Sequence, residues 1–122
     1  MPLYLSGPRA EEAAQVLGGR VVSDRIGDAS ALKMVYAAWT KGSSALLVAV
    51  RAAARELGVE AALLEEWDDA LAARHEAAER SARRKGWRFV GEMDEIAATF
   101  EAAGLPRGFH EAAAAVFGGC RH

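Results

Sequence analysis

The stretch that most constrains this chain is residues 28–57, which contains no proline and carries apolar residues at helical spacing. Those apolar positions are Leu32, Val35, Trp39, Leu46, Val50, Ala53 and Leu57. The spacing predicts one uninterrupted amphipathic helix, which would be roughly 45 Å long. Such a helix is longer than a compact domain of this size can bury along one side. We therefore expect the other segments, and a second chain as well, to pack around it.

Small residues occupy the middle of this predicted helix, at Gly42, Ser43 and Ser44. They lower helix propensity, and they either let another helix approach closely or mark a kink. The apolar positions continue in phase on both sides of them, which favours close packing.

Composition favours a mainly α fold, because the chain is very rich in alanine, a strong helix former. With 122 residues we expect a single domain over 1–122. The net charge of −2 gives no electrostatic reason to bind nucleic acid or an acidic membrane. The sequence has no apolar run of about 20 residues, and its single cysteine, Cys120, suits a reducing compartment. We expect a cytoplasmic protein.

The N-terminal part reads as a β-α-β appendage. Residues 2–6 and 20–23 are short strand candidates, and a helix is expected between them, from Ser6 to the Gly18-Gly19 pair. Two such strands cannot form a stable sheet alone. They either pair into a small ribbon on the helices or are the trailing edge of a larger sheet.

Three further helices are expected after Gly58. The first runs from 59 through 71 and continues to 85, where Gly86 interrupts it. The second, over 89–103, ends at Gly104-Leu105-Pro106 in the order typical of a helix C-terminus. The last starts at 107 or 108, and the tail 120–122 is expected to be frayed. Its inward-facing residues are predicted to be Phe109, Ala113, Val116 and Phe117.

Few residues point to chemistry by themselves. The sequence has neither G-x-G-x-x-G nor a Walker motif. His75 and Glu79 could share a helix face and hold a metal, but a surface role fits better, and we expect no metal. The basic run Arg80, Arg83, Arg84 and Lys85 reads as a solvated face, with an anionic cofactor phosphate as the alternative.

Lys33 is the leading candidate for a site residue. It lies off the apolar stripe, on a face with Ala37, Thr40 and Ser44. A lysine near a helix start is poorly placed for stability, because the helix dipole is positive there. The same position suits an amine that exchanges protons during a reaction.

The stretch IGDASALKMVYAAWTKG resembles the interdomain helix of the β-hydroxyacid dehydrogenase and 6-phosphogluconate dehydrogenase superfamily. The stretches WRFVGEMDEIAATF and AGLPRGFH resemble the helical C-terminal domain of phosphogluconate-dehydrogenase-like oxidoreductases, so the likeness runs from about Leu3 to Phe117. The resemblance implies that residues 1–25 are the last strand-helix-strand of a missing NAD(P)-binding Rossmann domain. Residues 26–122 would be the helical domain that closes the substrate cleft and forms a homodimer.

The superfamily motif G-x-G-x-x-x-K-x-x-x-N maps onto this helix only in part. Gly27 matches its first glycine and Lys33 its lysine, which implies a general acid/base role for Lys33. Ala29 and Ala37 replace the second glycine and the asparagine, and Tyr36 could donate a hydrogen bond in place of the asparagine. We therefore expect Lys33 and Tyr36 to be catalytic. The expected substrate-binding residues are Gly27, Ala29, Ala37, Thr40 and Lys41.

Three functions remain open. The first is the substrate-side and dimerisation domain of an NAD(P)-dependent dehydrogenase or reductase, with no nucleotide-binding domain and no cofactor of its own. The second is a stand-alone helical enzyme that uses Lys33 for an elimination or a cyclisation. The third is a non-catalytic dimerisation or binding module.

Overall fold

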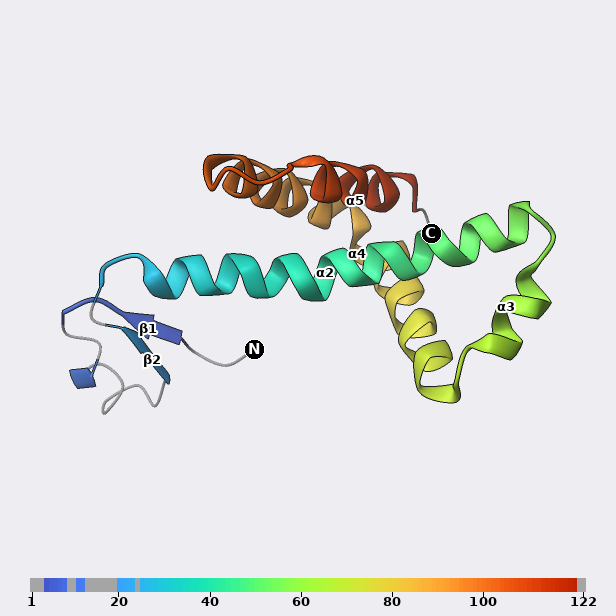
Figure 1. The fold of residues 1–122 in the computed structure, drawn as a ribbon, viewed down its shortest axis with the longest axis horizontal. Coiled ribbons are helices and arrows are strands. Elements are labelled where there is room, and N and C mark those ends of the chain that lie inside the picture. Colours follow the sequence, from blue (N-terminus) through green and yellow to red (C-terminus); the bar gives the residue numbers. More distant parts are fainter. Residues whose placement is uncertain (1–3, 9–10, 13–19, 24, 121–122) are drawn as a thin grey trace. The chain divides into compact units, whose positions relative to one another are not determined.

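The computed structural model describes residues 4–8, 11–12, 20–23 and 25–120. It divides into two compact units, Met1–Ala37 and Ala38–His122. In chain order the elements are β1 (Tyr4–Ser6), β2 (Arg20–Ser23), α2 (Asp28–Glu56), α3 (Glu60–Glu66), α4 (Asp69–Ala102) and α5 (Gly108–Gly119) (Figure 1). The predicted fold, mainly helical with a short N-terminal β appendage, is confirmed. The predicted division at residues 25/26 stays a prediction.

β1 and β2 form a parallel pair, with Tyr4 opposite Arg20 and Leu5 opposite Val21. Both predicted strands are therefore confirmed. Parallel strands need a crossover connection of a dozen or so residues, usually a helix. The helix predicted for this connection lies mostly outside the described residues, of which Glu11 and Glu12 are helical.

The start of α2 depends on a residue far away in sequence. Gly27 has a φ of +93°, a conformation that favours glycine, and its main-chain oxygen accepts a hydrogen bond from Ala31 at 3.0 Å. The hydroxyl oxygen of Ser6, the last residue of β1, accepts a hydrogen bond of 2.6 Å from the main-chain N–H of Ala29. A strand residue thus satisfies one of the N–H groups that every helix start leaves without an internal partner.

α2 is unbroken through Gly42, Ser43 and Ser44, as predicted. Its C-terminal end is closed by Gly58, which has a φ of +74°. The N–H of Gly58 binds the oxygen of Arg55 at 3.2 Å, and the N–H of Val59 binds the oxygen of Ala54 at 2.9 Å. This pair of bonds is a Schellman motif, and it stops the helix where the sequence predicted.

The next helix ends earlier than predicted. α3 stops at Glu66, and Trp67 has extended backbone angles. Asp68 then caps α4, because its carboxylate accepts a hydrogen bond of 2.7 Å from the N–H of Leu71. The prediction of one helix across 59–85 is wrong, since a capping aspartate begins a new helix within that range.

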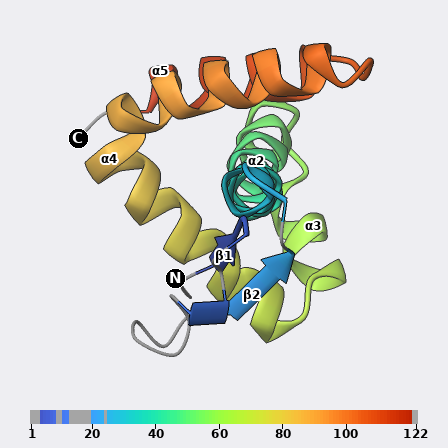
Figure 2. The same ribbon diagram turned by 90° about the vertical axis from the view of Figure 1, so that its left-hand side faces the viewer.

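α4 passes through Gly86 without interruption, so the predicted helix end at that residue is also wrong. The ribbon changes direction between the yellow N-terminal part and the orange C-terminal part of α4 (Figures 1 and 2). Gly86 lies near the middle of α4 in sequence. Gly86 is buried, because the end of α5 approaches its main chain closely.

The core lies mainly between α4 and α5, which share the most extensive contact among the described helices. They form a helical hairpin that turns at Gly104, with a φ of +80°. Met93, Ile96 and Phe117 are the largest fully buried side chains. Phe89 meets the Phe117 ring edge-on, with ring centroids 5.1 Å apart.

Candidate functional site

Five predicted site residues lie in the first unit: Gly27, Ala29, Lys33, Tyr36 and Ala37. Gly27 forms the turn before α2, and Ala29, Lys33 and Ala37 share a helix face because they are four residues apart. The side chains of Lys33 and Tyr36 are exposed, whereas Ala29 and Ala37 are half-buried. Lys33 thus presents its ammonium group to solvent. The functional roles of these residues stay predictions.

The other two predicted residues, Thr40 and Lys41, lie in the second unit and have partners there. The ammonium of Lys41 forms an ion pair with Glu92 of α4, and it stands 4.7 Å from the ring centroid of Phe89. The main-chain oxygen of Thr40 accepts a hydrogen bond of 2.9 Å from the hydroxyl of Ser44. Lys41 therefore helps to hold α2 against α4.

The apolar stripe of α2 is exposed along much of the second unit. Trp39 is 69% exposed and Leu46 is 64% exposed. The buried residues of α2 are all alanines, namely Ala38, Ala45 and Ala54. The chain itself therefore leaves much of the apolar stripe uncovered, and the packed side of this helix carries small side chains.

A groove of about 670 Å³ runs between α2 and α5, and we call it the α2–α5 groove. Trp39 and Leu46 line it from α2, and Phe109 and Val116 line it from α5. Phe109, which the sequence placed on the inward face of its helix, is 72% exposed at this groove. An open apolar groove edged by aromatic rings is typical of an interaction surface.

His110 lines the same groove and joins its two walls. Its Nε2 lies 3.0 Å from the main-chain oxygen of Ala38. A carbonyl oxygen only accepts, so Nε2 carries the proton of a neutral ring and Nδ1 carries the lone pair. Nδ1 is buried and has no hydrogen-bond partner within the described residues. The Phe100 ring packs on the imidazole, with centroids 4.7 Å apart.

Gly42 makes the close contact of α5 with α2 possible. A Cβ on this residue would stand 3.0 Å from Nε2 of His110, tighter than nearly all real Cβ contacts. The sequence prediction that the small residues of α2 admit another helix is confirmed here.

Trp39 and Leu46 also line a second groove, of about 230 Å³, together with Leu47, Val50 and Trp67. The two residues therefore stand as a ridge between two grooves, and we call them the Trp39–Leu46 ridge. The second unit thus carries an apolar projection directly beside apolar hollows.

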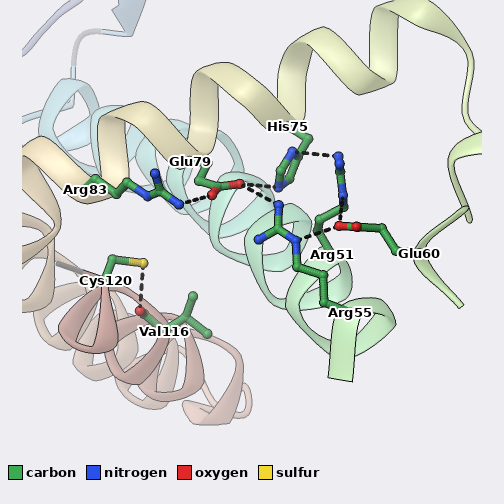
Figure 3. A network of polar contacts seen from close by, with 8 residues as sticks. All are labelled: Arg51, Arg55, Glu60, His75, Glu79, Arg83, Val116 and Cys120. Carbon is green, nitrogen blue, oxygen red and sulfur yellow. Dashed lines mark hydrogen bonds and ion pairs between the residues drawn. The ribbon is translucent and has the colours of Figure 1, made fainter. Parts of the chain in front are cut away.

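A polar network connects α2 with α3 and α4 (Figure 3). The Nε atoms of Arg51 and Arg55 donate hydrogen bonds of 2.8 and 2.6 Å to the same carboxylate oxygen of Glu60. These bonds hold the pKa of Glu60 below its usual value. Arg51 also donates through Nη1 to Nδ1 of His75, over 3.3 Å, which leaves the proton of a neutral ring on Nε2.

His75 is only 2% exposed, and this burial lowers the pKa of His75 below its usual value, because the charged form would lose its hydration. The attraction of Glu79 acts in the opposite sense without reversing the shift. Nε2 of His75 lies 3.0 Å from a carboxylate oxygen of Glu79, but the contact is not aligned as a hydrogen bond. Glu79 also pairs with Arg83 at 2.5 Å and stands 3.6 Å from Arg55.

Sequence reasoning placed His75 and Glu79 on one helix face, which is correct, but it expected that face to be exposed, and His75 is buried. It missed the approach of Arg51 and Arg55, whose only sequence signal is their own one-turn spacing. Within the described residues, no group of three or more side chains is placed to hold a metal ion. The same part of the chain contains no helix with the length and apolar character of a membrane span.

Residues 54–119, more than half of the chain, match a family described as Domain of unknown function (DUF1932). The chain belongs to the DUF1932 family. DUF1932 domains are found C-terminal to NAD(P)-binding, dehydrogenase-like domains. That position agrees with the coarser part of the sequence resemblance, a helical domain associated with dehydrogenases.

A solved structure gives the second comparison for this DUF1932 chain. It is similar to a crystal structure described as a conserved hypothetical protein from Sinorhizobium meliloti 1021, with 29% identity and a TM-score of 0.79. The similarity covers 94% of this chain and 42% of that one, so this chain spans less than half of the longer protein. No curated protein matches the chain.

Proposed function

We propose that this chain is the substrate-side and dimerisation domain of an NAD(P)-dependent dehydrogenase or reductase. The position of DUF1932 domains after NAD(P)-binding domains supports the link to such an enzyme. These residues contain no glycine-rich phosphate loop, so the nucleotide would be held by a separate Rossmann domain. The parallel pairing of β1 with β2 supports this arrangement, because parallel strands belong to larger sheets covered by helices.

The observation that carries the dimerisation role is the Trp39–Leu46 ridge beside the α2–α5 groove. A surface with an apolar projection next to an apolar hollow is complementary to itself. In a twofold dimer the ridge of one copy enters the groove of the other, and the same contact repeats across the axis. Trp39 and Phe109 provide the kind of large aromatic anchors that dominate interface energies.

Sedimentation of the purified chain tests this pairing. We expect the wild type to sediment as a dimer at micromolar concentration. Leu46→Glu should give a monomer, because it places a charge in the apolar contact. Leu57→Glu is the matched control, since Leu57 is also an exposed leucine, just past the end of α2, but lines neither groove, and it should stay dimeric. A monomeric wild type, or the same behaviour of both variants, would contradict the pairing.

Within this role we assign general acid/base catalysis to Lys33, supported by its match to the superfamily lysine and by its exposed position on α2. The test uses a protein that carries this domain together with its NAD(P)-binding domain. Lys33→Ala should lower kcat about 100-fold or more while leaving the circular dichroism spectrum unchanged. Lys85→Ala, also an exposed lysine, is the control and should keep full activity. An active Lys33→Ala enzyme would remove Lys33 from the mechanism.

A further inference from the structure

A pocket of about 260 Å³ between α2 and α4 is lined entirely by ionisable side chains. It lies within the second unit, and five of the residues drawn in Figure 3 line it, namely Arg51, Arg55, His75, Glu79 and Arg83. Arg51 and Arg55 reach it from α2, and Arg80 and Arg83 reach it from α4. We propose that this pocket binds a phosphoryl group, as free phosphate or as part of a phosphate monoester.

Contacts within the protein hold the guanidinium groups of Arg51, Arg55 and Arg83 in place. These contacts use only some of the N–H donors of each guanidinium group. Arg51 uses Nε on Glu60 and Nη1 on His75, and Arg55 uses Nε on the same carboxylate. Arg83 uses one terminal nitrogen on Glu79. A guanidinium has five N–H donors, so each of these arginines keeps donors that none of these contacts uses. Tethered in this way, an arginine loses little side-chain entropy when it binds an anion.

His75 and Glu79 hold in position the two helices that carry the arginines of the pocket. The buried imidazole accepts from Arg51 on one side and faces Glu79 on the other, so it sets the spacing between α2 and α4 at the pocket. Its Nε2–H has no aligned hydrogen bond within the described residues.

Arg80 is the one arginine of the pocket that makes no ion pair or hydrogen bond within the described residues. The sequence spacing of Glu76 and Arg80 would allow a pair one turn apart, yet only Glu79 and Arg83 form such a pair here. Arg80 is exposed, so it can swing onto a ligand without breaking a contact of the fold.

The directions of the donors favour a tetrahedral phosphoryl group over a planar carboxylate, and the net charge favours an anion. The four arginines face three carboxylates, Glu60, Glu76 and Glu79, which leaves a net charge of +1 while His75 is neutral. Glu60 and Glu79 are already engaged by arginines, whereas Glu76 faces the pocket and opposes an anion. A planar carboxylate engages one guanidinium fork, while a phosphoryl group offers oxygens to donors from several directions, as they stand on the two helices here.

Titration calorimetry on the whole chain tests the proposal, with inorganic phosphate and glycerol 3-phosphate as the two probes at constant ionic strength. We expect saturable binding of at least one probe. Arg80→Gln should weaken it roughly tenfold, the equivalent of one charge-assisted hydrogen bond. Arg84→Gln is the matched control, because Arg84 is an exposed neighbour that does not line the pocket, and it should bind like the wild type. Glu76→Gln should tighten binding.

The comparison of the two probes identifies the source of the group. Tighter binding of glycerol 3-phosphate would indicate a phosphorylated metabolite, and equal binding would indicate that the phosphoryl group alone is recognised; either result supports the proposal. The absence of saturable binding to both probes would overturn it. Equal weakening in Arg80→Gln and Arg84→Gln would overturn it too, because that result reports diffuse charge and no built pocket.

Discussion

The main-chain oxygen of Phe117 lies 2.7 Å from the position that a Cβ atom on Gly86 would occupy. The obstacle is backbone at the end of α5, so it cannot move aside as a flexible side chain would. Gly86→Ala should therefore push α5 away from α4 and lower the free energy of unfolding by about 1–3 kcal/mol. Urea denaturation followed by circular dichroism measures this change.

Gly91 provides the control in the same helix, because a Cβ there would meet no atom within 4 Å. Gly91→Ala should raise the free energy of unfolding by about 0.5–1 kcal/mol, since alanine favours a helix more than glycine does. Equal effects of the two substitutions would show that the contact between Gly86 and Phe117 does not govern the packing of the hairpin.

Asp68 should matter for stability although it is exposed. Its carboxylate accepts a hydrogen bond from the N–H of Leu71 at the first turn of α4. Asp68→Ala should lower the free energy of unfolding by about 1 kcal/mol, the usual effect of losing such a cap. Asp68→Asn should restore nearly all of it, because asparagine caps equally well. A destabilised Asn variant would argue that the charge of Asp68, and not its hydrogen bond, is what stabilises α4.

The buried His75 should make the domain less stable in mild acid. Burial, with Arg51 and Arg55 nearby, keeps the pKa of His75 below 6.5 in the folded chain, and Glu79 and Glu76 only partly offset it. As the pH falls below 6.5, His75 takes up a proton in the unfolded chain more readily than in the folded chain, so the free energy of unfolding decreases. Above 6.5 the imidazole is neutral in both states, and its contribution to stability is fully present.

The measurement is the free energy of unfolding between about pH 5 and pH 8, where one such proton gives a slope of up to about 1.4 kcal/mol per pH unit. His75→Gln keeps an acceptor for Arg51 but cannot titrate. The slope in this window should be smaller for the variant than for the wild type. Identical slopes would assign the acid sensitivity to other groups.

Cys120 should react slowly with alkylating reagents. Its thiol donates a hydrogen bond of 3.3 Å to the main-chain oxygen of Val116, and burial raises the pKa of Cys120, with Glu79 adding to the effect. Because the thiolate is the reactive form, iodoacetamide at pH 7.5 should modify the folded chain several-fold more slowly than the chain in denaturant. Equal rates would mean that the end of α5 is open in solution.

Local signals in the sequence were enough to predict much of the fold. Glycines that need a positive φ, Gly58 and Gly104, end α2 and α4 where predicted, and the two short strands form as expected. Gly86 misled the prediction, because a glycine in a helix can serve a close contact as well as an end. The start of α4 at Asp68 was not predicted, because the residues on both sides of Asp68 have good helical propensity.

The apolar pattern of α2 predicted a helix correctly but not which face of it is buried. Periodicity shows that one side of a helix is apolar, but not whether the same chain or a partner covers that side. The ionisable pocket was equally hidden, since it needs Arg51 and His75 to come together from helices that are distant in sequence. The structure shows that Lys33 is exposed, and the catalytic role of Lys33 stays a prediction.

The alanines on the packed side of α2 limit the hydrophobic stabilisation of a single copy of this chain. Burying Ala38, Ala45 and Ala54 removes far less apolar area from water than burying Trp39 and Leu46 would. Under the proposed pairing, a large share of the hydrophobic stabilisation arrives only when two copies meet. Folding and assembly are then one equilibrium, and the midpoint of thermal unfolding rises with protein concentration.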